Sequence, residues 1–145
     1  MSRYRFTEFV SEIQAEKDIF GNTLLNWQKY GWLGYDKPLE TYFLQLDKDE
    51  DYPTIWYGTK WLEIKSPYVL TALIEKLFLC SIKFNQEIID ALIHERNSNY
   101  AEIEIVKRLE EWDNRYREQS FAFQKEYIEE GFVKNVLETE YNLAD

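Results

Sequence analysis

Apolar residues recur every three or four positions along the last third of the chain, which predicts an amphipathic helix. The stripe consists of Ile105, Leu109, Trp112, Tyr116, Ser120, Phe123 and Tyr127. We expect one helix from Ser98 to Gly131, about 32 residues or roughly 48 Å long. A domain of this size has a diameter of about 35 to 40 Å, so that helix must project, bend or break, most readily near Gln119 and Ser120. A short last helix is expected over residues 132–141.

Four earlier segments also show helical spacing. Phe6, Phe9, Val10 and Ile13 predict a first helix whose pattern fades after Lys17. Further helices are expected over residues 23–30, over residues 68–84, and from residue 86 to about residues 96–99. The first of these is capped by Asn22 and stopped by Gly31 and Gly34. Ser66 followed by Pro67 is a strong start signal for the helix over residues 68–84, and Asn85 can cap the helix that starts at residue 86. The 68–84 segment is apolar almost all round and is therefore the expected central helix.

Between Leu39 and Ile64 the period of the pattern changes to two, which predicts strands. The apolar positions are Tyr42, Leu44 and Leu46, then Ile55 to Tyr57, then Leu62 and Ile64. Gly58-Thr59 suits a tight turn, and the acidic run from Asp47 to Asp51 suits a longer connection. The predicted fold class is α+β, mainly helical, with a small antiparallel three-stranded sheet packed on a central helix and a long C-terminal helix. One domain over residues 1–145 is expected.

Charge narrows the choice of partner. The 145 residues carry 27 Asp and Glu against 17 Lys and Arg, a net charge of -10, and 12 of the acids lie in residues 102–145. Nucleic acids are held mainly by cations that neutralise phosphates, so direct nucleic-acid binding is not expected. A basic protein partner is electrostatically favoured. The plainer alternative is that the acidic surface serves solubility alone.

Few residues are available for catalysis or metal binding. Cys80 is the single cysteine and His94 the single histidine, which leaves no intramolecular disulfide, histidine-rich zinc site or hydrolytic triad. Nucleotide-binding loops, nucleophile elbows and kinase motifs are absent. We therefore expect no enzyme, no cofactor and no metal. The N-terminus lacks a signal-peptide core and the apolar window 69–84 is too short and too charged to span a bilayer, so we expect no membrane partner and a cytoplasmic location.

Candidate contact residues lie in the acidic connection and in the strand after it: Asp47, Asp49, Glu50, Asp51, Trp56 and Tyr57. Interface energy concentrates in Trp, Tyr and Arg, so this segment predicts a docking loop for a basic partner, with Trp61 as a further anchor. Its alternating acids also copy the opening of a calcium loop, but Tyr52 stands where that loop needs glycine and Gly58 where it needs glutamate. The plainer alternatives are a solvated hairpin loop and aromatic residues that fill the core.

A second acidic face is predicted on the long helix, at Glu110, Glu111, Glu118 and Glu126. Such a face can imitate phosphates and block a nucleic-acid-binding site on another protein. The alternative is an ordinary solvated helix, because pairs such as Glu111 and Arg115 stand four positions apart with opposite charge.

These patterns predict a small acidic protein-binding protein that inhibits or neutralises a basic, nucleic-acid-processing partner, as an immunity protein, an antitoxin or a phage-encoded inhibitor would. A structural subunit or adaptor that uses its long helix for oligomerisation is the alternative, and a metal-dependent carboxylate enzyme is third. The sequence leaves the oligomeric state open.

Overall fold

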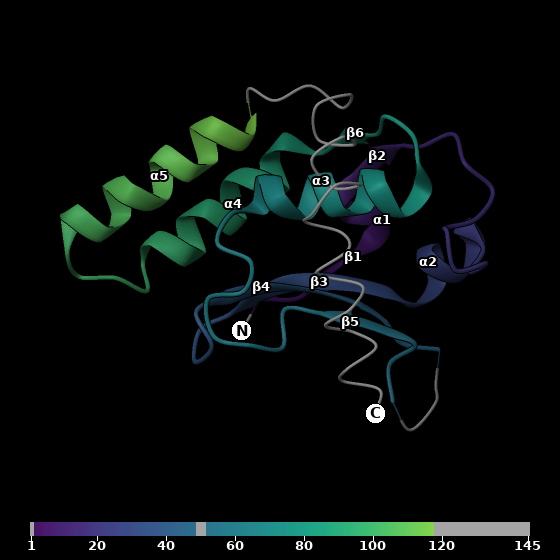
Figure 1. Cartoon of the computed structure of the whole chain (residues 1–145), viewed down its shortest axis with the longest axis horizontal. Helices are drawn as coiled ribbons and strands as arrows, with labels where there is room; N and C mark the ends of the chain where they lie inside the picture. Colours follow the sequence, from purple (N-terminus) through teal and green to yellow (C-terminus); the bar gives the residue numbers. More distant parts are fainter. Residues whose placement is uncertain (1, 49–51, 118–145) are drawn as a thin grey trace.

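The computed structural model describes residues 2–48 and 52–117, which form a layer of helices over an antiparallel sheet (Figure 1). The strands are β1 (Tyr4–Arg5), β2 (Val10–Glu12), β3 (Gly31–Asp36), β4 (Thr41–Leu46), β5 (Ile55–Tyr57) and β6 (Lys83–Phe84). The helices are α1 (Phe6–Phe9), α2 (Leu24–Tyr30), α3 (Pro67–Phe78), α4 (Gln86–Asn97) and α5 (Ile103–Arg117). The chain is therefore α+β, as expected, but the sheet differs from the prediction.

The sheet is four-stranded, with the order β1-β3-β4-β5 and every neighbouring pair antiparallel. The predicted three-stranded meander is wrong at both ends. Leu62 and Ile64 do not form its last strand. The Leu62 N–H donates to the Leu39 carbonyl, before β4, and the Ile64 carbonyl accepts from the Tyr42 N–H, near the start of β4. No strand was expected directly after α2, but the segment there, which contains Trp32 and Tyr35, forms β3, one of the two inner strands of the sheet. The switch occurs at Gly31, where a Cβ would lie 2.5 Å from the carbonyl oxygen of Trp27.

The N-terminal segment is the second correction, because the expected long first helix is a single turn between two strands. Phe6 and Phe9 point into the core from α1, and Val10 then begins β2, which pairs with β6 in a separate two-stranded sheet. One helical turn followed by a strand gives the same spacings of three and four residues as a continuous helix. The apolar pattern alone therefore did not distinguish these two structures.

Helix α3 is the central helix of the core, as predicted. Ser66 caps it, its hydroxyl oxygen accepting from the Tyr68 backbone N–H, and Pro67 follows at the first helical position. Every residue of α3 is buried, and the helix contacts β4, α4 and α5. The predicted end at residue 84 is wrong. Leu79 adopts a left-handed backbone with φ of 52° and terminates the helix, which frees residues 83–84 to pair with β2.

Helices α2 and α4 confirm the expected segments. Asn85 caps α4 as predicted, whereas Thr23 and not Asn22 caps α2. Helix α5 begins at Ile103, five residues later than expected, because the chain turns after α4. The described part of α5 ends at Arg117; the rest of the predicted long helix and the helix over residues 132–141 lie outside the described residues.

A buried ion pair joins α4 to α5. The Arg96 guanidinium contacts both carboxylate oxygens of Asp113 at 2.7 Å, and the two side chains are only 1% and 8% exposed. The Ser66 hydroxyl donates to the same carboxylate at 2.6 Å, so one acidic group connects both helices to the start of α3. Asp113 therefore belongs to the core and not to the acidic surface.

Candidate functional site

Large aromatic side chains are exposed around the edge strand β5. Tyr52 is 81% exposed, Trp56 44% and Trp61 64%, and these three residues lie within ten positions of one another. Among the described residues, β5 is an edge strand of the four-stranded sheet and has β4 as its one neighbouring strand. Exposed aromatic residues at a sheet edge are typical of protein interaction surfaces. We call this group the β5-edge surface.

Strand alternation explains which aromatics are available. Trp56 lies opposite Gln45 in β4, and Gln45 lies opposite Trp32 in β3, so these three residues share one face of the sheet. Ile55 and Tyr57 point to the other face, where Tyr57 is 3% exposed in the core beneath the helices. Tyr57 was expected to contact a partner but belongs to the core. Because side chains alternate along a strand, an outward Trp56 already predicts that Tyr57 points inward.

The predicted acidic residues of this region are described only in part. Asp47 is half-buried at the end of β4, and its backbone N–H donates to the Tyr30 carbonyl. Asp49, Glu50 and Asp51 lie outside the described residues.

The second predicted face lies elsewhere on the molecule. Glu110 and Glu111 are exposed on α5, which is in the helical layer and not at the β5 edge (Figure 1). A shallow hollow there is lined by Glu111 together with Arg108, Trp112 and Arg115. Cations and anions are therefore mixed on this part of α5. Glu118 and Glu126 lie outside the described residues.

A corner at one end of the β5-edge surface brings together residues that the sequence pattern did not indicate. The Trp61 indole N–H donates to Oε2 of Glu40, a residue of the turn between β3 and β4. The Tyr100 hydroxyl interacts with Tyr35 and with Glu40. Burial makes the largest contribution to raising the pKa of Tyr100, and these two interactions raise it further. Asn99 donates to the Tyr35 hydroxyl oxygen at 3.2 Å. Because Glu40, Trp61 and Tyr100 are far apart in the chain, no local motif could have indicated them.

The backbone of this corner adopts unusual conformations. Glu40 has φ of 52° and Leu62 has φ of 53°, both in the left-handed region that non-glycine residues rarely occupy. The Leu62 backbone N–H donates to the Leu39 carbonyl at 3.0 Å, which holds the two segments side by side. Strained residues of this kind persist only where surrounding contacts fix them.

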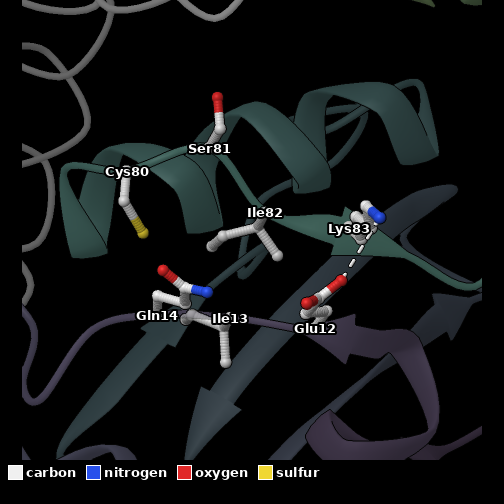
Figure 2. Close-up of a pocket in the computed structure, with 7 residues that line it drawn as sticks. All are labelled: Glu12, Ile13, Gln14, Cys80, Ser81, Ile82 and Lys83. Atoms are coloured by element: carbon white, nitrogen blue, oxygen red, sulfur yellow. Dashed lines mark ion pairs between the residues drawn. The ribbon is translucent and has the colours of Figure 1, made fainter.

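A hollow of about 390 Å³ lies between β2 and the chain after α3, and Cys80 lines it (Figure 2). Figure 2 shows the Cys80 sulfur on the side of Gln14, with Glu12 and Lys83 at the far end. Glu12 and Lys83 form an exposed ion pair at 3.3 Å. Burial, with a smaller contribution from Glu75, raises the pKa of the Cys80 thiol, which keeps it protonated and poorly nucleophilic at neutral pH. Cys80 is therefore not an activated nucleophile.

Within the described residues, no group of three or more His, Cys, Asp or Glu side chains is placed to hold a metal ion. The same residues contain no helix long and apolar enough to cross a membrane. No protein-family model, curated protein or solved structure matches the chain.

Proposed function

We propose that this protein is a small acidic binding protein of the cytosol that inhibits or neutralises a basic protein partner, in the manner of an immunity protein, an antitoxin or a phage-encoded inhibitor of a nucleic-acid-processing enzyme. The observation that carries the proposal is the β5-edge surface, where Tyr52, Trp56 and Trp61 are exposed next to the acidic connection at residues 47–51.

The two components of this surface have different physical roles. Aromatic side chains lose little conformational freedom on binding and bury much apolar area, so they supply most of the residence time of a complex. The net charge of -10 accelerates the encounter with a basic partner and disfavours acidic ones. One cysteine, with a raised thiol pKa, is compatible with a reducing compartment.

Site-specific photo-crosslinking tests the proposal. The full chain, with Tyr52 replaced by p-benzoylphenylalanine, is expressed in its native cells and irradiated, and the adducts are identified by mass spectrometry. We expect a basic protein at this position. The matched control carries the same crosslinker at Ile103, which is also largely exposed, at 70%, but lies on α5. Absence of a basic adduct at residue 52, or equal capture at both positions, would refute the proposed surface.

Binding kinetics with the captured partner separate charge from contact. Neutralising Asp47, Asp49, Glu50 and Asp51 to Asn or Gln should slow association and flatten its salt dependence, whereas Trp56→Ala should raise the dissociation rate. Unchanged rates in the neutralised variant would exclude this loop and move the interface to Glu110, Glu111, Glu118 and Glu126. A mass that rises with concentration for the protein alone would instead favour the alternative, self-association.

A further inference from the structure

The five tryptophans differ in whether a cation already contacts the ring. Trp27 is buried and donates to Asp18. The Arg3 guanidinium lies 4.1 Å from the ring centroid of Trp32, and both Lys65 and Arg115 lie 5.4 Å from that of Trp112. Trp56 and Trp61 are the exposed tryptophans, and within the described part of the chain no cation lies over either ring.

Of these two rings, Trp61 is the one joined to a carboxylate. Its indole N–H donates to Oε2 of Glu40, which places the negative group at the edge of a ring that is 64% exposed. The two oxygens of a carboxylate together accept about four hydrogen bonds, so the contacts with Trp61 and Tyr100 do not exhaust this acceptor. Glu40 forms no ion pair with any other described residue. An exposed aromatic face beside an unneutralised carboxylate has the two features that bind a planar cation, a negative quadrupole and an anionic acceptor.

The corner is also held in place before any partner arrives. Tyr100 contacts Glu40 from the side of the α4–α5 connection, and Asn99 anchors the same turn by donating to the Lys37 carbonyl at 3.2 Å. The Leu62 to Leu39 hydrogen bond fixes the segment that carries Trp61. Because the carboxylate and the ring are already oriented, little conformational entropy is lost on binding.

We propose that Trp61 and Glu40 bind an arginine side chain of the basic partner. The guanidinium stacks on the Trp61 ring, as Arg3 does on Trp32, and donates to the Glu40 carboxylate. Arginine is favoured over lysine because its planar group both stacks and donates several hydrogen bonds, while an ammonium is a strongly hydrated point charge. Lys37 and Lys60 are exposed and close in sequence to Glu40 and Trp61, so their charges oppose a cationic ligand, and salt reduces this repulsion. This inference rests on the proposed function, because the arginine belongs to the basic partner proposed there.

The test is an NMR titration of the full chain with the peptide acetyl-(Gly-Arg)₄-amide, using the indole ¹⁵N–¹H signals as reporters. We expect the Trp61 signal to move most. Trp61→Ala should weaken binding about fivefold and Glu40→Gln about threefold, from the usual strengths of exposed cation–π and ion-pair contacts. The (Gly-Lys)₄ peptide should bind more weakly. Glu104→Gln makes the same change in net charge at an exposed position of α5 and is the matched control, with no more than about a 1.5-fold effect expected from general charge.

Further variants keep the outcome interpretable. Glu40→Gln retains an acceptor for the Trp61 N–H, so its amide spectrum should match that of the wild type and any lost affinity reflects charge. Trp61→Phe keeps a ring without the N–H and should bind at an intermediate level. If Trp61→Ala and Glu40→Gln bind like Glu104→Gln, the arginine site is rejected, while a basic adduct at residue 52 would still sustain the proposed function. An arginine effect confined to the corner without such an adduct would support the site and reject the function.

Discussion

Asp113→Ala should be among the most destabilising single substitutions of a polar residue in this protein. Its carboxylate accepts two hydrogen bonds at 2.7 Å from Arg96 and one at 2.6 Å from Ser66. With the carboxylate removed, the Arg96 guanidinium remains buried in the core without an anion.

The expected loss is about 3 to 5 kcal/mol of unfolding free energy, which is typical when one partner of a buried ion pair is removed. The lower end applies here, because Arg96 keeps hydrogen bonds to the Lys65 carbonyl at 3.1 Å and to the Asn97 side chain at 2.9 and 3.1 Å. Those contacts satisfy part of its hydrogen-bonding capacity but supply no negative charge.

Urea unfolding followed by circular dichroism measures the effect. A loss of about 3 kcal/mol lowers the midpoint by about 1 to 3 M if the slope is unchanged. Glu110→Ala, an exposed acid on the same helix, is the control and should stay within about 0.5 kcal/mol of wild type. The double variant Arg96→Met with Asp113→Leu should recover much of the stability, since no charge is then left unpaired. A loss below about 1 kcal/mol for Asp113→Ala would refute the reasoning.

Three other predictions concern the core and the titratable groups. Leu73→Ala and Leu77→Ala should each cost about 2 to 5 kcal/mol in the same unfolding assay, because both side chains are fully buried in α3, and near-neutral values would show that α3 is peripheral. Burial, partly offset by a hydrogen bond from the Ile82 N–H, raises the pKa of Glu75. The folded state therefore favours the protonated carboxyl and loses stability as the pH rises through that pKa. Glu75→Gln should be more stable than wild type at pH 7, and the difference should vanish below about pH 4. EDTA and reductant should leave the melting temperature unchanged within about 2 °C, since one cysteine and one histidine cannot build a structural disulfide or zinc site; a larger fall with either reagent would contradict this.

Elements with strong local signals could be predicted from the sequence. Ser66-Pro67 and Asn85 mark the starts of α3 and α4 because a capping side chain satisfies backbone donors within two or three residues. Strands β4 and β5 follow from the alternation of apolar residues, with Trp56 outward and its neighbours inward. These interactions are local, so the residues that make them are adjacent in the chain.

The remaining features depend on contacts between distant segments. The Phe6 and Phe9 pattern fits a helix or a turn followed by a strand, and pairing of β2 with β6, more than 70 residues away, decides for the second. Trp61 and Glu40 are 21 residues apart, and Arg96 and Asp113 are 17 apart on different helices. Composition showed that the surface is acidic. Which carboxylate is buried against a guanidinium, and which accepts from an exposed indole, follows only from the packing of α3, α4 and α5 and from the hydrogen bonds that join the turn before β4 to the loop after β5.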